Sequence, residues 1–186
     1  MANGTLKVSN IQTSSGSGTI TIGQSGETVA LGSGASQTLA VNTPAFSAYA
    51  GSDQSSIVDQ TWTKVAMNTE FYDTDSAYDT SNYRFTVPSG KAGKYVFAAS
   101  MYVQGSANLE DLSFGFYKNG TKVFYKESAV DNRVDAQVYA TIDLAVGDYV
   151  ELYIYMNIAS GGTGTVNQDG STTNNRVYWY GYKLIT

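Results

Sequence analysis

The chain has 186 residues, of which 15% are charged, and its formal net charge is −5 at pH 7. Such a chain lacks the basic surface that nucleic-acid binding requires, so no nucleic-acid partner is expected. The absence of histidine and cysteine excludes disulfides, the usual zinc clusters, thiolate nucleophiles and histidine-dependent serine catalysis. We therefore predict a protein that is not an enzyme and needs no cofactor.

The composition favours β structure, because the chain holds 15 Tyr, 7 Phe and 19 Gly but only two prolines. Aromatic residues suit half-buried strands, and glycine suits the turns between them. No stretch approaches the ~20 apolar residues of a membrane span, so membrane insertion is not expected. The first residues, MANGTLKVSNIQ, lack the apolar segment of a secretory signal.

Residues 1–41 form a distinct N-terminal arm of Gly, Ser, Thr and isolated aliphatics. GTITIG (18–23) and ETVALG (27–32) repeat nine residues apart, and a flexible linker has no reason to hold aliphatics in register. We predict short strands that anchor or trimerise the chain by pairing with other chains, while a disordered tail is the alternative. The anchoring residues are Leu6, Val8, Ile11, Ile20, Ile22, Val29 and Leu31.

Residues 42–186 read as an all-β domain in which short strand-like runs alternate with turn signals. Asn119-Gly120 predicts a type I′ hairpin turn, because both central residues of that turn need positive φ. The aromatic runs within 81–100 are predicted to fold back on each other. The expected strands are 45–49, 61–65, 70–73, 83–87, 93–104, 111–118, 121–128, 133–144, 149–158 and 176–184.

Several motifs in this domain resemble the C1q/TNF-like trimeric jelly roll. They occur in order as PAFSAY (44–49), WTKV (62–65), AYD…YRFTVP…GKYVF (77–97), FYKNG (116–120), IDLAVGDYVELYI (142–154) and YWYGYKL (178–184). The resemblance implies a ten-stranded sandwich and a threefold homotrimer. The arm, which opens TLKVSNIQTSSGSGTITIG, is similar to structural proteins of tailed bacteriophages, particularly marine and cyanophage-type ones.

Tyrosines on two predicted strands are more apolar than a solvated face requires. One face of 149–158 carries aliphatics for the core, and the other carries tyrosines; the last strand repeats this surplus. We interpret them as one sheet that is buried inside by the sandwich and outside by two symmetry mates. Burial under the chain's own loops and a sugar-stacking surface are the alternatives. The predicted trimer-interface residues are Tyr149, Tyr153, Tyr155, Tyr178, Tyr180 and Tyr182.

The densest acidic cluster, EFYDTDSAYD at 70–79, does not fit a calcium loop of the EF-hand type. Counted from Asp73, the fifth, sixth and twelfth positions are Ala77, Tyr78 and Arg84, where a ligand, Gly and Glu are needed. We predict no metal site here and a turn with Asx caps instead. A calcium site elsewhere stays an alternative.

The stretch SGGTGTVNQDGSTTNN, residues 160–175, is long for a connection in a sandwich. Its polar side chains suit the hydroxyls of a sugar, and a passive connection is the alternative. The candidate ligand residues are Asn167, Asp169, Asn174 and Asn175.

Together these observations predict a non-enzymatic protein of a tailed-phage virion surface. It is expected to be a homotrimeric capsid decoration or head-fibre protein, whose arm attaches to the major capsid protein or another virion protein. A tail-fibre tip that recognises a host surface glycan or protein is the first alternative. A lectin-like module unrelated to a virus is the second.

Overall fold

The computed structural model describes residues 11, 26, 28, 33, 42–129, 133–168 and 175–184. The chain divides into two units, Met1–Leu39 and Ala40–Thr186, and we call the second the head. The predicted strands of the arm lie outside the described residues. Among the predicted anchoring residues only Ile11 is described, and its side chain is exposed.

The described part of the head is built from strands, with one short 3-10 turn, η1 (Ala159–Gly161). All strand pairs are antiparallel and form two sheets. Sheet A contains β1 (Ala45–Tyr49), β2 (Gln54–Val58), β4 (Thr69–Asp73), β7 (Gly93–Gly105), β10 (Arg133–Leu144), β12 (Thr163–Val166) and β13 (Tyr178–Lys183). Sheet B contains β3 (Thr63–Lys64), β5 (Tyr78–Asp79), β6 (Arg84–Thr86), β8 (Leu109–Lys118), β9 (Thr121–Ala129) and β11 (Tyr149–Ile158).

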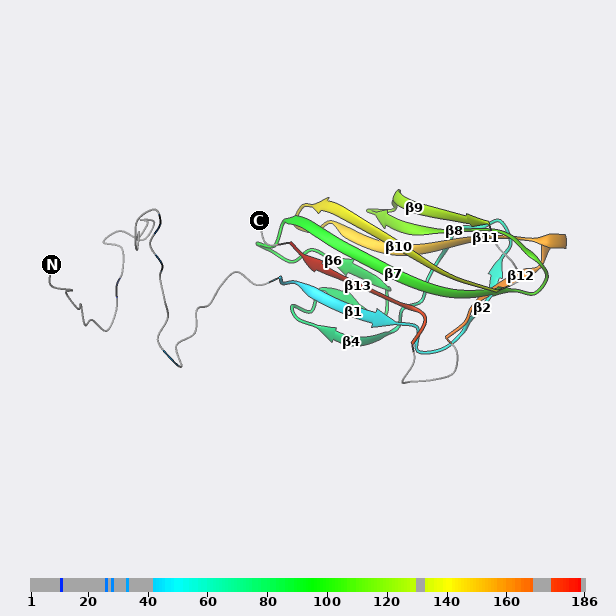
Figure 1. Cartoon of the computed structure of the whole chain (residues 1–186), viewed down its shortest axis with the longest axis horizontal. Coiled ribbons are helices and arrows are strands. Elements are labelled where there is room, and N and C mark those ends of the chain that lie inside the picture. The colour runs from blue at the N-terminus through cyan, green and yellow to red at the C-terminus, as the bar shows by residue number, and fades with distance from the viewer. Residues whose placement is uncertain are drawn as a thin grey trace. The chain divides into compact units, whose positions relative to one another are not determined.

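The two sheets pack face to face as a sandwich, with β7 and β13 in one layer and β8 and β11 in the other (Figure 1). Strand order in sheet A is β2-β12-β7-β13-β1-β4, and β10 pairs with the other edge of β7. Sheet B runs β5-β6-β11-β8-β9, with β3 also paired to β11. The prediction of an all-β jelly-roll sandwich is confirmed.

Aromatic rings fill the middle of the core, where inward-facing positions of the two sheets meet. The ring of Phe46 stacks on Tyr78, with centroids 4.9 Å apart, and meets the edge of Trp179 at the same distance. Each such ring contributes about 1.5–3 kcal/mol to stability through burial. The alternating pattern of each strand therefore decides which face turns inward.

The prediction that the two runs within 81–100 pair with each other is wrong. β6 pairs with β5 and β11 in sheet B, whereas β7 pairs within sheet A. Their aromatics instead meet across the core, where the ring centroid of Phe85 lies 5.3 Å from Tyr95 and 5.7 Å from Phe97. Alternation identified the buried residues correctly, but it does not distinguish a hairpin from two strands facing each other.

The Asn119-Gly120 hairpin is confirmed, since both residues have positive φ, at 50° and 77°, and Lys118 pairs with Thr121. Residues 160–175 are more than a passive connection, because they contain β12, which pairs with β2 on one side and β7 on the other. Neither β2 nor β12 was predicted.

Candidate functional site

A row of alternating large and small side chains crosses the outer face of sheet A. The register places Tyr139 of β10 opposite Ala98, Ala98 opposite Tyr180, and Tyr180 opposite Ser47, which is in turn opposite Tyr72 of β4. Directly opposed residues share one face of a sheet. Tyr139 and Tyr72 are 64% and 50% exposed, whereas Ala98 is buried. In this row, tyrosines therefore alternate with the small residues Ala98 and Ser47.

Tyrosines in the neighbouring rows extend this surface. Tyr178 lies opposite Tyr49, and its ring stacks on that of Tyr180 with centroids 6.5 Å apart. Burial raises the pKa of Tyr180, and the nearby Tyr178 and other tyrosines raise it further. We call this surface the tyrosine face; it consists of Tyr49, Tyr72, Tyr139, Tyr178, Tyr180 and Tyr182.

The predicted interface residues of β11 do not belong to the tyrosine face. Tyr149, Tyr153 and Tyr155 lie on sheet B, so the interpretation that all six tyrosines share one sheet is wrong. Trp62, in the segment before β3, covers part of them, and its ring centroid lies 5.6 Å from that of Tyr155. Tyr153 packs against Tyr117 of β8, with ring centroids 4.2 Å apart. A two-residue period assigns side chains to a face of one strand but does not assign strands to a sheet.

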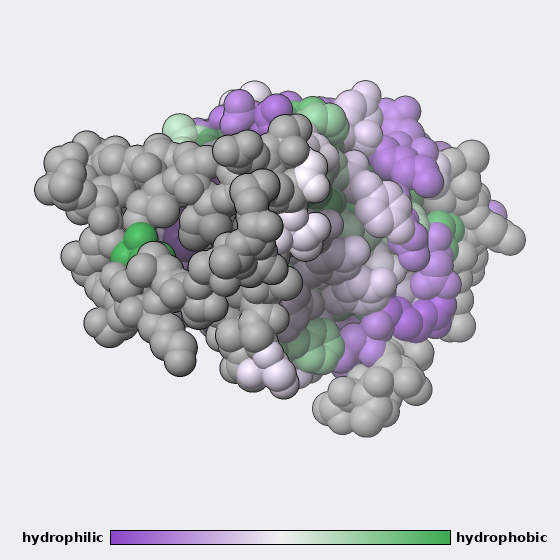
Figure 2. Space-filling view, turned by 60° about the vertical axis from the view of Figure 1, so that its left-hand side comes forward, coloured by the Kyte–Doolittle hydropathy of each residue, from purple (hydrophilic) through white to green (hydrophobic). Residues whose placement is uncertain are grey.

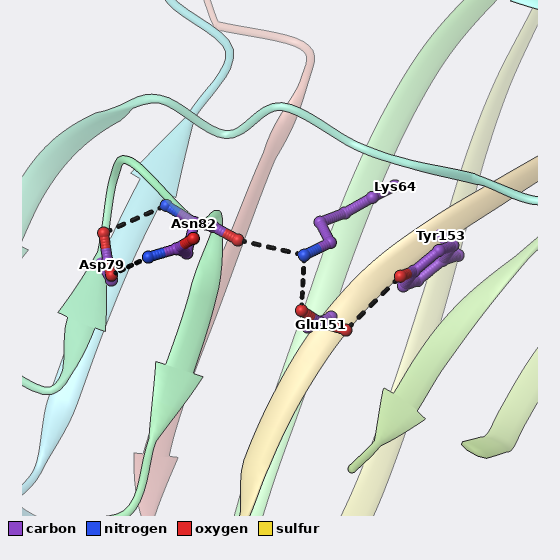
Figure 3. A network of polar contacts seen from close by, with 5 residues as sticks. All are labelled: Lys64, Asp79, Asn82, Glu151 and Tyr153. Atoms are coloured by element: carbon purple, nitrogen blue, oxygen red, sulfur yellow. Dashed lines mark hydrogen bonds and ion pairs between the residues drawn. The ribbon is translucent and has the colours of Figure 1, made fainter. Parts of the chain in front are cut away.

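A polar network on sheet B fastens this covering segment to β11 (Figure 3). Lys64 Nζ of β3 donates to Glu151 Oε1 at 2.5 Å, and also to the carbonyl of Asn82 at 3.3 Å. Glu151 is buried, with 5% of its surface exposed. A carboxylate in that position requires a partner, because an unpaired buried charge is strongly unfavourable.

Tyr149 is also packed by the chain itself. The guanidinium carbon of Arg84 lies 4.8 Å from the centre of the Tyr149 ring, and the Tyr149 backbone N–H donates to Asn119 Oδ1. The tyrosines of β11 thus fit the alternative of burial under neighbouring segments. Those of β13 remain as candidates for contact with another molecule.

The acidic cluster around β4 and β5 forms capped turns. Asp73 Oδ2 accepts from the backbone N–H of Tyr78, and Asp79 Oδ1 accepts from the N–H groups of Ser81 and Asn82. The side-chain amide of Asn82 also donates to Asp79 Oδ2 at 2.6 Å. This bond contributes most to lowering the pKa of Asp79, and the two backbone bonds lower it further. Within the described residues no three His, Cys, Asp or Glu side chains gather into a group that could hold a metal ion.

A polar cleft of about 270 Å³ opens where β2, β12 and β7 meet. Of the predicted ligand residues, Asn167 lines this cleft, and Asn175 Oδ1 accepts from Gln168 Nε2 nearby. Asp169 and Asn174 lie outside the described residues. The described residues that line it are Asp53, Ser55, Gln104, Gly105, Ser106, Thr163, Thr165 and Asn167.

Several residues of these two surfaces escaped sequence reasoning. Tyr72 and Tyr139 join the tyrosine face only through cross-strand register, which sequence does not give. Gln104 and Asp53 reach the cleft from strands or loops far from residues 160–175. The one available signal was the outward position of Gln104 at the end of a long alternating run.

The coloured part of the surface seen in Figure 2 is amphipathic rather than broadly apolar. In the view of Figure 2, hydrophobic residues form small separate patches among pale and strongly hydrophilic side chains. Tyrosine suits protein interfaces of this kind, because its ring buries area while its hydroxyl makes hydrogen bonds. Across the described ranges, the structure contains no helix of the length and apolarity that crossing a membrane requires.

Two proteins of Bacillus subtilis (strain 168) are similar in sequence to this chain, while no family model matches it. The phage-like element PBSX protein XkdV is 29% identical over 123 residues, which is 60% of this chain and 17% of that protein. The uncharacterized protein YqcC is 29% identical over 114 residues, 57% of this chain and 30% of that protein. The matches thus span less than a third of either relative.

Two solved structures that resemble the head are a C1q globular domain and APRIL, a TNF-like jelly roll. The globular domain of zebrafish complement 1qA has a TM-score of 0.50 and 16% identity, covering 77% of this chain and 98% of that one. Murine APRIL has a TM-score of 0.54 and 11% identity, with coverage of 75% and 98%. Domains of this fold are typically trimeric. The head therefore has the jelly-roll fold of C1q and TNF-like domains, and the chain is similar in sequence to a protein of a phage-like element.

Proposed function

We propose that this chain is a homotrimeric structural protein on the surface of a phage particle. Three copies associate through the tyrosine face, and residues 1–41 attach the trimer to the major capsid protein or another virion protein. The observation that carries this function is the row of half-buried and exposed tyrosines on the outer face of sheet A, in a fold that is typically trimeric. The similarity to a phage-like element protein supports the assignment to a particle.

The arrangement of side chains on the tyrosine face supports trimer formation. Ridges of Tyr180 and its neighbours beside the buried floor of Ala98 can interlock with side chains of another copy. Strands β9 and β10 are the outermost strands of their sheets, and on β9 the side chains of Phe124 and Tyr125 are 42% and 50% exposed. This edge of one copy supplies aromatic side chains for the tyrosine face of the next.

Attachment through the arm makes use of the threefold symmetry. A trimer carries three arms, so three weak contacts to neighbouring coat subunits add to a strong attachment. The apolar residues of the arm, such as Ile20 and Val29, would pair with strands of the particle. The head itself then acts mechanically, as a capsid decoration or head fibre, without a reaction to catalyse.

Deletion of residues 1–41 tests the anchoring role. The truncated head should remain trimeric but should fail to join particles in a complementation assay, because the attachment segment is gone. The full-length Tyr180→Lys variant is the matched control. It keeps the arm but should not form the trimer, so the two variants separate loss of attachment from loss of assembly. Normal incorporation of the truncated head would overturn the anchoring role.

A second location on the particle is favoured by the position of the polar cleft. The cleft lies at the end of the head that holds β2 and β12, whereas β1 begins at the opposite end (Figure 1). At the end where β1 begins, Lys183 of β13 pairs with Tyr95 of β7. Nine residues of β7, or about 30 Å, separate Tyr95 from Gln104 in the cleft. A head that is anchored through its N-terminal end would present the cleft outward, as a tail-fibre tip requires. Antibody labelling of particles in electron microscopy distinguishes heads from tails.

A further inference from the structure

We propose that the cleft between β2, β12 and β7 binds an uncharged sugar residue, the terminal unit of a glycan. The cleft is assigned from its own chemistry, and its outward position rests on the proposed attachment of the chain to a particle. Its lining is almost entirely polar and comes from three adjacent strands and the loops that follow them.

The walls of the cleft are held in place by the fold. Ser106 and Thr163 exchange hydrogen bonds, Ser106 N–H to the Thr163 carbonyl at 2.8 Å and Thr163 N–H to Ser106 Oγ at 2.9 Å. Asp53 Oδ1 accepts from the backbone N–H of Gln168 at 2.7 Å. Preorganised polar groups of this kind bind without the cost of ordering loops.

The groups that face the cleft both donate and accept hydrogen bonds. Gln104 of β7 lies directly opposite Thr165 of β12, which sets a side-chain amide beside a hydroxyl. Ser55 and Thr163 add two more hydroxyls. Neighbouring hydroxyls of a sugar also donate and accept, so they match this mixture, whereas an apolar ligand would leave these groups unpaired.

Charge selects against acidic ligands. Among the described residues that line the cleft, Asp53 is the only charged one, and none is Lys or Arg. An anionic sugar would meet the Asp53 carboxylate without a compensating cation. The volume of about 270 Å³ is below the usual range for drug-sized ligands, which limits the site to a small unit.

The cleft and the tyrosine face occupy successive lengths of sheet A. Tyr178 lies opposite Ser100, four residues or roughly 13 Å along β7 from Gln104. Trimer formation through the tyrosine face therefore leaves a separate site on each copy. Three sites on one trimer raise the avidity for a repeated surface glycan.

NMR titration of the full chain tests this site with four probes: the methyl glycosides of glucose, galactose, mannose and N-acetylglucosamine. At least one is expected to bind with a dissociation constant of about 1 mM and to shift the amide signals of Gln104 and Thr165. Glucuronic acid, which adds a carboxylate to glucose, should bind at least about tenfold more weakly than glucose. No shift with any of the four probes at about 50 mM would overturn the assignment.

Two substitutions locate the binding, because neither removes a hydrogen bond described for the fold. Thr165→Val and Gln104→Met should each weaken binding about tenfold and leave the thermal midpoint and the remaining spectrum unchanged. Thr121→Val, at an exposed hydroxyl on β9, is the matched control and should not change binding. Binding that survives both cleft substitutions, or shifts confined to other residues, would also overturn the assignment. Trimer mass and incorporation into particles are measured separately, so failure of the sugar site would leave the structural role intact.

Discussion

Tyr178 and Tyr180 stack on the outer face of β13, with an angle of 12° between their ring planes. Alternate residues of a strand lie about 6.6 Å apart, which places their rings in one continuous ridge. In the row through Tyr180, this ridge stands between the small residues Ala98 and Ser47. The relationship gives the head a shaped surface that a second copy can fill.

The first prediction concerns oligomeric state. Tyr180→Lys should convert the trimer to a monomer in sedimentation, because it places a charge in the centre of the proposed interface. Tyr153→Lys is the matched substitution on sheet B and should leave the trimer intact, since Tyr153 contacts Tyr117 of its own chain. It should lower the stability of the head by about 1–2 kcal/mol through lost ring packing. Dissociation caused by Tyr153→Lys instead would place the interface on sheet B.

The second prediction concerns the buried ion pair. Lys64→Met should destabilise the head by about 2 kcal/mol in urea unfolding, because it leaves the Glu151 carboxylate buried without its cation. The cost falls below that of a fully buried pair, since 31% of the Lys64 side chain is exposed. Adding Glu151→Gln to Lys64→Met should restore part of the lost unfolding free energy, because the buried charge is then removed. Lys94→Met, at an exposed lysine of β7, should have little effect, and an equal loss there would contradict the role of the pair.

The third prediction concerns acid stability. Hydrogen bonds from Lys118, Asn119 and the backbone of Ala145 lower the pKa of Asp148 to about 2, from an ordinary value of 3.8. A depressed pKa stabilises the head above the unfolded value, and this contribution is lost as pH falls from about 4 to about 2. Asp148→Asn should therefore reduce the change of the unfolding free energy with pH between about 4 and about 2. Asp143→Asn, at an exposed carboxylate, is the control; if it flattens the profile equally, Asp148 is not the cause.

The fourth prediction concerns the close approach of β9 to Gly115 of β8. A Cβ at Gly115 would lie 2.0 Å from the carbonyl oxygen of Phe124 and 2.5 Å from Tyr125 Cα, and a backbone neighbour cannot rotate away. Gly115→Ala should therefore displace β9 and cost about 2 kcal/mol or more. Ser113→Ala, two residues earlier on β8, should cost much less. Comparable unfolding free energies for the two variants would mean that β9 adjusts freely.

Alternation in the sequence predicted the longest strands well. β7, β10 and β11 carry aliphatic and aromatic residues at every second position, so tertiary packing and local pattern agree. β2 and β12 were missed, because QSSIV and TGTV offer few apolar residues and turn-like composition. Their strand conformation comes from pairing with each other and with β7.

The candidate surfaces were predicted only in part for the same physical reason. The alternation of side chains along a strand placed Tyr178, Tyr180 and Tyr182 on one face of β13. It placed the tyrosines of β11 on one face of that strand in the same way. Which sheet each strand joins depends on long-range pairing, which local pattern does not encode. Asn167 was selected for its polar surroundings. Thr163 and Thr165 are its sequence neighbours in the cleft, but the other lining residues, at 53, 55 and 104–106, come from segments more than 60 residues away.

Native mass spectrometry of the full chain tests the proposed threefold assembly most directly. With one chain of 19.9 kDa, three copies give about 60 kDa, and this species should dominate at micromolar concentration. It should disappear in Tyr180→Lys in favour of a species of one chain. A wild-type protein that is found only as a single chain of 19.9 kDa would contradict assembly through the tyrosine face.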